Sequence, residues 1–314
     1  ERRADAAILL GDNCYYVNRL GSSSNSVWLG GWLRADWDDP RRMLLRQLAA
    51  RNLPQLAALS RTTNMHATWD DHDFGFNNSA GHDTNKWVGR ELASMIFRAM
   101  WPGPYAAEDG RSIYHTFRTG PVEVFITDTR YEKNHRARVT LGEVQLRWLL
   151  ERLAASDAPV KILVVSSQFL YRPRPESFLA EAPAERLAIL EALGLGSSPG
   201  TVRGRVLLVA GAVHHSELLR APTTGAPKIL EVTSSSIRTG ESGSSMTEWE
   251  PGSQLWAVQR DAFGVVSVDV RGWSGDTVDG TITIEARDAA GELLKVGDRP
   301  CRTVWQLADG TLGS

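Results

Sequence analysis

Three aspartates and a histidine occupy four consecutive positions in the stretch ATWDDHDFGFNNS, residues 67–79, as Asp70, Asp71, His72 and Asp73. Neighbouring carboxylates repel one another in water, so such a run is typical either of a solvated acidic loop or of a loop that binds a cation. Carboxylate and imidazole together suit hard or borderline ions such as Fe, Mn, Zn or Ca. The rest of the sequence decides between these two interpretations.

Polar side chains also follow three other apolar segments. They are Asp12, Asn13 and Tyr15 after AAILL, Asp128 and Arg130 after VEVFI, and His214 and His215 after VLLVA. In open α/β sheets, ligands bind beyond the carboxyl ends of the strands. A single aspartate after a strand more often forms a turn, and a pair of histidines is also commonly structural. Four clusters placed alike, however, predict a shared metal-binding set.

Motif and spacing argue against several other chemistries. If Asp70 began an EF-hand loop, Phe74 would stand at position five and Gly81 at position twelve, where that loop requires Asp or Asn and Glu. The sequence has no GxSxG motif and no Gly-rich phosphate loop, so covalent serine catalysis has no support. The two cysteines, Cys14 and Cys301, form neither a disulfide framework nor a CxxC metal motif, and we expect Cys14 to be a packing residue.

The clusters need strands to carry them, and the apolar pattern supplies strands in alternation with helices. Strands are predicted at residues 6–13, at the start of 64–73, and at 120–130, 160–168 and 204–215, and helices at 40–53, 85–101, after Thr140 and at about 184–193. From about residue 228 the segments are β-like and separated by Gly-rich turns, and 233–246 is a Ser/Gly-rich loop. We therefore predict an α/β fold, with a single domain over residues 1–314 whose C-terminal part is β-rich.

Composition narrows the possible partners. Hydrophobic residues make up 42% of the 314 residues and charged residues 23%, as in an ordinary globular protein. The formal charge of −2 gives no general attraction to polyanions, so a nucleic-acid partner is not expected. The sequence contains no apolar stretch of about 18 residues, so no transmembrane helix is predicted. Because the chain begins at Glu1, we interpret it as a processed product.

The order of the motifs resembles one known family. LGDNCYY contains the GDxxY block of purple acid phosphatases, and TWDDHDFGFNN, TDTRYEKN, SSQ and AGAVHHSEL follow it in order. Together they resemble the blocks of the PhoD-like alkaline phosphatase D family. The resemblance implies a calcineurin-like metallophosphoesterase core, which is a four-layer α-β-β-α sandwich. It also implies hydrolysis of phosphate monoesters and diesters, with Fe and Ca among the metal ions, and it favours a secreted or periplasmic protein.

The resemblance also assigns roles, position by position. The implied metal ligands are Asp12, Tyr15, Asp71, Asp128, His214 and His215. The implied catalytic residues are His72, Asp73 and Arg130, and the implied substrate-binding residues are Arg130, Asn134 and His72. Two or more metal ions, with Mn or Zn as further options, would activate a water molecule and polarise the phosphoryl oxygen. The crowded carboxylates of the opening stretch are then explained by the cations expected among them.

The sequence departs from the family pattern in two places. Ala212 stands where the family has a metal-binding aspartate, and alanine offers no lone pair, so we expect activity to be impaired. The change is either engineered or natural. The second departure is upstream of Gly11, where the family has a first strand with a metal ligand and an N-terminal β-sandwich domain. Here that first strand is interpreted as missing.

Two alternatives stay open beside the phosphoesterase. One is a non-catalytic protein that keeps the fold and binds a phosphate ligand, for which Ala212 is the best support. The other is a phospholipase D-like or nuclease diesterase with the same site, although the net charge weakens the nuclease version. The Trp-rich segments 27–37 and 100–104 suit an apolar rim for a lipid substrate, but such tryptophans are more often core residues. We therefore expect a small-molecule or lipid phosphate ester as the substrate.

Overall fold

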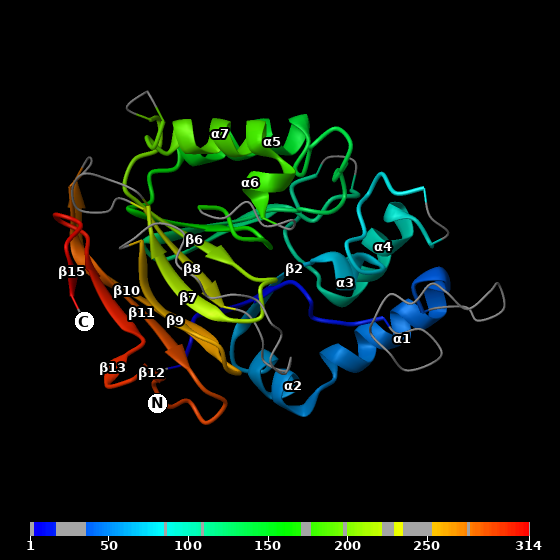
Figure 1. The fold of residues 1–314 in the computed structure, drawn as a ribbon, viewed down its shortest axis with the longest axis horizontal. Helices are drawn as coiled ribbons and strands as arrows, with labels where there is room; N and C mark the ends of the chain where they lie inside the picture. Colours follow the sequence, from blue (N-terminus) through cyan, green and yellow to red (C-terminus); the bar gives the residue numbers. More distant parts are fainter. Residues whose placement is uncertain are drawn as a thin grey trace. The chain divides into compact units, whose positions relative to one another are not determined.

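The computed structural model describes residues 3–16, 36–84, 87–107, 110–170, 177–196, 200–221, 229–234, 253–274 and 277–313. It shows a mixed α/β fold, which confirms the predicted class (Figure 1). The chain divides into two compact units. The first consists of Glu1–Thr116 and Ile126–Leu146, and the second of Phe117–Phe125 and Arg147–Ser314.

The first unit holds a small parallel sheet and the described helices of the N-terminal part of the chain. Its elements are β1 (Ala6–Leu10), the 3-10 helix η1 (Asp36–Asp38), α1 (Pro40–Arg51), α2 (Pro54–Ser60), β2 (Asn64–Thr68), α3 (Asp71–Phe74) and α4 (Arg90–Met100). Strands β1 and β2 pair in parallel, with Leu10 opposite Thr68 at their carboxyl ends. This register brings the residues that follow the two strands to the same edge of the sheet.

An aromatic cluster anchors that edge. Trp69 comes directly after β2 and is fully buried, as are Phe74 of α3 and Phe97 of α4. The Trp69 ring lies 4.9 Å from the Phe74 ring and 5.1 Å from the Phe97 ring, measured between centroids. Because large aromatic side chains bury much apolar area, these contacts hold the acidic stretch on both sides.

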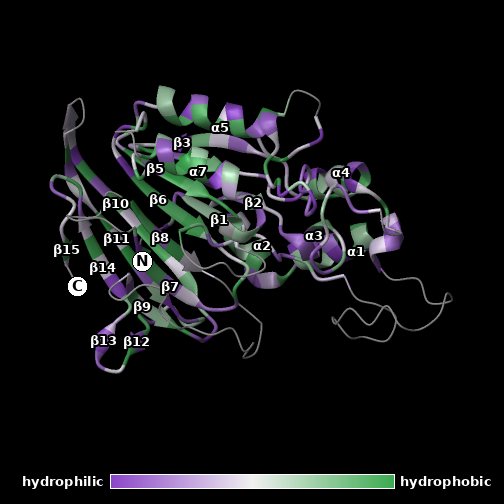
Figure 2. Cartoon of the chain, turned by 45° about the horizontal axis from the view of Figure 1, so that its top comes forward, coloured by the Kyte–Doolittle hydropathy of each residue, from purple (hydrophilic) through white to green (hydrophobic). Residues whose placement is uncertain are grey.

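The second unit contains a seven-stranded mixed sheet. Its order is β3 (His115–Thr119), β4 (Val122–Ile126), β5 (Val160–Val164), β6 (Arg205–Ala210), β8 (Ile229–Ser234), β7 (Ser216–Arg220) and β9 (Gln254–Val258). Its helices are α5 (Glu143–Ala155), α6 (Phe178–Glu181) and α7 (Pro183–Ala192). All five residues of β5 are buried, and Figure 2 shows β5, β6 and β8 as hydrophobic strands. The sequence predicted such burial for the near-continuous apolar runs.

The described elements from Ile229 onward are all strands. The elements after β9 are β10 (Phe263–Ser274), β11 (Thr277–Arg287), β12 (Lys295–Val296), β13 (Arg299–Pro300), β14 (Arg302–Gln306) and β15 (Leu312–Gly313). Four of them form an antiparallel sheet in the order β10-β11-β14-β15, and β12 pairs with β13. Arg205 of β6 donates from Nε and Nη2 to the carbonyl of Leu307, at 3.0 and 2.8 Å. Figure 1 shows this sheet and the helices α5 and α7 on different sides of the seven-stranded sheet.

The predicted helices correspond to observed helices whose bounds differ by a few residues. The helix predicted over 40–53 is α1, which begins after the N-cap Asp39 and has Asn52 as its C-cap. The helix predicted over 85–101 begins at Arg90, because Gly89 has a φ of +87° and cannot continue a helix backwards. The acidic stretch is a one-turn helix with a loop after it.

Two predicted segments lie mostly outside the described residues, namely the loop 233–246 and the Trp-rich segment 27–37. In the described chain no helix is long and apolar enough to cross a membrane.

Candidate functional site

The site forms where the loops after β1 and β2 meet. Gly11 has a φ of +98°, and a Cβ added there would lie 2.6 Å from the Cβ of Asp70. Only glycine allows this close approach. Asp12 follows with a φ of +51°, a conformation that Asp tolerates better than most residues. The GD pair therefore places the Asp12 carboxylate against the acidic helix α3.

Asp73 ties the two loops together. Its Oδ1 accepts a hydrogen bond from the backbone N–H of Cys14 at 2.9 Å. Its Oδ2 accepts from the backbone N–H of Asp70 at 3.1 Å and from Nδ2 of Asn13 at 3.3 Å. Burial raises the pKa of Asp73 to about 7. Asp73 therefore holds the two loops together through hydrogen bonds. Its implied catalytic role stays a prediction.

Asp12 has few hydrogen-bond partners among the described residues. Its Oδ2 accepts a hydrogen bond from the Tyr15 hydroxyl at 3.0 Å. Its Oδ1 is buried and has no hydrogen-bond partner among the described residues. Burial, and after it the charges of Asp71, Asp70 and Asp73, raise the pKa of Asp12 well above its usual value. A buried oxygen without a donor, amid like charges, is costly unless a cation neutralises it.

Asp71 and His72 face the same point. Ligand atoms of Asp12, Asp71 and His72 all lie within 4.8 Å of one another. Burial raises the pKa of Asp71, but the charges of Arg130 and His72 and the N–H of Asn78 outweigh it, so this pKa is lowered. Asp71 therefore stays ionised. These residues fit a hard or borderline metal ion through oxygen and imidazole ligands.

The Tyr15 ring stacks on His72, with centroids 4.2 Å apart. Burial, followed by the charge of Asp12, raises the pKa of the Tyr15 hydroxyl. Tyr15 is thus a neutral donor to Asp12 in this structure. Its role as a metal ligand, which needs the proton to leave, stays a prediction.

Arg130 is held inside the acidic helix cap. It is 2% exposed, and its Nε donates to Oδ1 of Asp70 at 2.7 Å. Its Nη2 also bonds Asp70, and its Nη1 donates to the carbonyl of Ser79 at 3.2 Å. Breaking a buried ion pair is costly. Phosphate binding by Arg130 stays a prediction, and it would require the guanidinium to leave these partners.

Asp128 is saturated with donors. Its Oδ1 accepts from Nε1 of Trp69 at 2.7 Å and from the backbone N–H groups of Arg130 and Tyr131. Its Oδ2 accepts from the Ser112 hydroxyl at 2.6 Å and from the backbone N–H of Ile113. Two carboxylate oxygens offer about four lone-pair sites. These five hydrogen bonds weigh against Asp128 as a metal ligand, which stays a prediction. Asn134, a predicted substrate contact, uses its Oδ1 to accept from the N–H groups of Arg136 and Ala137.

The histidine pair belongs to the second unit. His214 is half-buried and has a φ of +56°. His215 is fully buried, with Nδ1 3.0 Å from the carbonyl of Val213 and Nε2 3.0 Å from Oε1 of Glu217. Both ring nitrogens of His215 thus face protein atoms. Ala212 has a φ of +67° and carries no ligand atom. Metal binding by His214 and His215 stays a prediction.

Several residues that shape the site were not assigned from the sequence. Trp69 stands directly before the acidic run, which was a usable signal for an anchor. Ser112 and Gln145 gave none, although Gln145 accepts from the Asp128 N–H at 2.7 Å. Glu217 stands two residues after the histidine pair, and its contact with His215 depends on the turn into β7.

Comparison with known proteins agrees with the motifs. The PhoD-like phosphatase family matches residues 1–275, so the chain belongs to this family. Among solved structures, the chain is similar to a structure of PhoD at 18% identity and a TM-score of 0.71, covering 100% of this chain and 66% of that one. It is also similar to the purple acid phosphatase PPD1 of yellow lupin (Lupinus luteus) seeds, at 17% identity and a TM-score of 0.49, covering 77% and 42%. No curated protein matches the sequence. The chain spans just under two thirds of the PhoD chain that it resembles.

Proposed function

We propose that this chain is a metal-dependent phosphoesterase that hydrolyses phosphate monoesters or diesters with a metal-activated water. The observation that carries the proposal is the buried Oδ1 of Asp12, which has no partner among the described residues and lies beside ligand atoms of Asp71 and His72. Membership of the PhoD-like phosphatase family supports phosphate esters as the substrate class.

The proposal divides the work among a few residues. Asp12 and Asp71 would hold the metal ions, which would supply Lewis acidity toward the phosphoryl oxygen and lower the pKa of a coordinated water. The side chain of His72 is 14% exposed, so its imidazole is placed to contact the phosphate or the leaving oxygen. Asp73 and Arg130 act as positioning residues, because their polar atoms bind the loops that carry these groups.

The proposed function has consequences for the fold, the metal ions, the substrate and the compartment. The fold is proposed to be the four-layer α-β-β-α sandwich of calcineurin-like enzymes, acting as a single domain. Fe and Ca are the first choices of metal ion, with Mn and Zn as alternatives. The substrate is a small-molecule or lipid phosphate ester, and the protein is proposed to be secreted or periplasmic. The family resemblance supports the sandwich fold, the metal ions, the phosphate ester class and the compartment. The single domain is inferred from the order of the predicted elements, and the lipid substrate from the Trp-rich segments.

Ala212 supports a second candidate, a protein that binds a phosphate ligand without turnover. Aspartate or asparagine tolerates the left-handed conformation at this position better than alanine does. An alanine there loses both a ligand atom and a favourable backbone choice. The second candidate therefore differs from the first only in whether the metal centre is complete enough for chemistry.

The test is turnover of a generic phosphate monoester and diester by the wild-type chain, Ala212→Asp and Ala212→Asn, each with chelator and with metal restored. We expect chelator-sensitive turnover that rises at least about tenfold in Ala212→Asp but not in Ala212→Asn, since only the aspartate adds a charged ligand. Equal gains in both variants would indicate relief of backbone strain instead. Turnover that is not reduced by the chelator would contradict the metal-dependent mechanism. Phosphate binding without turnover in any variant would favour the second candidate.

A further inference from the structure

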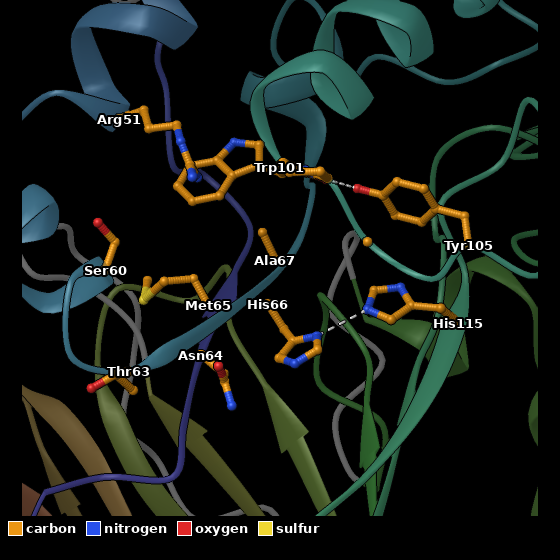
Figure 3. A pocket seen from close by; sticks show the side chains of 12 residues that line it. Arg51, Ser60, Thr63, Asn64, Met65, His66, Ala67, Trp101, Tyr105 and His115 are labelled. Carbon is orange, nitrogen blue, oxygen red and sulfur yellow. Dashed lines mark hydrogen bonds between the residues drawn. The ribbon is translucent and has the colours of Figure 1, made fainter.

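A second cluster of potential metal ligands lies in the first unit, outside the candidate site. A cavity of about 210 Å³ lies along β2 and is lined among others by His66, His115, Trp101, Tyr105 and Arg51, whose side chains are drawn in Figure 3. None of the residues assigned to the phosphoesterase centre lines it. Two imidazoles and a polar cavity in one place justify asking what ion or molecule they bind.

Two contacts fix the orientation of the buried His115 ring. It is 1% exposed, and its Nδ1 lies 2.8 Å from the carbonyl of Ile113. The carbonyl can only accept, so Nδ1 carries the proton and Nε2 presents a lone pair. The Tyr105 ring packs edge-on against the imidazole at 5.3 Å. A backbone carbonyl that fixes the tautomer of a histidine is the usual arrangement behind a metal-binding imidazole.

His66 presents its own nitrogen to that lone pair. Its Nδ1 lies 3.4 Å from Nε2 of His115, and Figure 3 shows the two rings turned toward each other. Two nitrogens that bind one tetrahedral ion at about 2.0–2.1 Å lie roughly 3.3–3.4 Å apart. The observed separation already matches that spacing. It is longer than the usual hydrogen bond of about 2.9–3.0 Å.

Both imidazoles are neutral near pH 7, which metal binding requires. Burial, and then the charge of His115, lower the pKa of His66 to about 4. Burial also lowers the pKa of His115, against the opposing effect of its bond to Ile113. In the absence of metal, Nδ1 of His66 carries a proton and donates a hydrogen bond to Nε2 of His115. Moving that proton to Nε2 of His66 leaves a lone pair on each of the two facing nitrogens, with no net proton released. The ring centroids lie 5.7 Å apart, so the two rings face each other head-on and would turn slightly to bind one ion.

We propose that His66 and His115 form a two-histidine site for a borderline divalent cation such as Zn²⁺, separate from the phosphoesterase centre. Imidazole nitrogen suits such ions, and the cavity provides room for water or a small anion at the remaining positions. The guanidinium of Arg51 stacks on the Trp101 ring at 4.7 Å. Its positive charge lowers the affinity for a divalent cation, so its removal is expected to leave binding equal or tighter.

The test is calorimetric titration of Zn²⁺ into the full chain carrying Asp12→Asn, which weakens the acidic centre. Co²⁺ is the second probe, because its visible absorption reports tetrahedral nitrogen ligation. We expect a site that loses at least about tenfold in affinity on His66→Gln or on His115→Gln. His66 is half-buried on β2, so His66→Gln keeps the fold even where the buried His115→Gln does not.

Matched controls are His82→Gln and His135→Gln, which change histidines outside the cavity, and Arg51→Ala. The proposal expects unchanged Zn²⁺ affinity in the first two and equal or higher affinity in the third. Affinity that survives His66→Gln in a folded protein would overturn the proposal. A loss on Arg51→Ala as large as that on His66→Gln would also overturn it, because the cavity would then bind an anion through the guanidinium.

Discussion

Asp12 and Asp128 are both aspartates that follow a strand, both lie in the first unit, and their surroundings are opposite. Asp128 is fully buried and accepts five hydrogen bonds. Asp12 accepts one, from Tyr15, and its Oδ1 lacks a donor in the described part of the chain. Protein donors stabilise the carboxylate charge of Asp128, whereas a bound cation would have to stabilise that of Asp12.

Hydrogen-bond saturation thus distinguishes a structural carboxylate from a metal ligand. A saturated carboxylate stabilises the loops that donate to it, and its removal leaves buried donors without partners. A carboxylate with an unpaired oxygen among like charges destabilises the metal-free fold. The same substitution is therefore expected to have opposite effects on stability at the two positions.

The largest expected effect is at Asp128. Replacing it by alanine should lower the free energy of unfolding by about 4 kcal/mol, because the Trp69 and Ser112 donors and three backbone N–H groups lose their acceptor. Asp128→Asn keeps the shape and half of the acceptor capacity, so about 2 kcal/mol is expected. Urea unfolding of the chelated proteins measures both. A loss below about 1 kcal/mol for Asp128→Ala would show that these donors find other partners.

Glu231 in the second unit is an intermediate case, with two donors. It accepts from the backbone N–H groups of Phe169 and Leu170 at 2.6 and 2.7 Å, yet burial raises its pKa from 4.5 to about 7. A raised pKa means that the fold prefers the protonated acid. The contribution of Glu231 to the free energy of unfolding is therefore fully present below pH 4.5. It is lost as the pH rises through 7, and the loss amounts to roughly 3 kcal/mol.

Unfolding of the wild type and Glu231→Gln at several pH values from 4.5 to 8 checks this. The variant cannot ionise there, so the advantage of the wild type should shrink by roughly 3 kcal/mol across the range. Taking the difference cancels the titration of other groups. A constant difference would show that the Glu231 carboxyl is ionised throughout.

A smaller effect is expected at Ala212, which is the second residue after the end of β6. Its φ of +67° costs an alanine about 1 kcal/mol, so Ala212→Gly should stabilise the fold by about that amount. Ala210→Gly, at the buried end of β6, is the matched control and should destabilise, because the backbone there is an ordinary strand. Thermal unfolding of both variants gives the comparison. Destabilisation by Ala212→Gly would remove the backbone argument for aspartate at this position.

The sequence supported the mixed α/β class and the family because apolar runs and ordered motifs are local signals. It also placed Asp12, Asp71 and His72 at neighbouring strand ends, which the register of β1 and β2 brings together. The spacing of residues could not show that both oxygens of Asp128 accept several hydrogen bonds. Its partner Ser112 lies in an upstream loop, and no sequence motif marks this serine as a partner. Nor could the spacing show that the Arg130 guanidinium points into the Asp70 cap rather than toward solvent. Which oxygens remain unpaired depends on packing between distant segments.

The most direct test of the metal centre is the Asp12→Asn variant, measured for metal binding by calorimetry and for unfolding in the presence of chelator. We expect metal affinity to fall at least about tenfold. We also expect the chelated variant to unfold at a higher urea concentration than the chelated wild type, because the variant lacks the buried carboxylate without a donor. Unchanged metal affinity together with lower stability would contradict both expectations, because Asp12 would then be a structural carboxylate like Asp128.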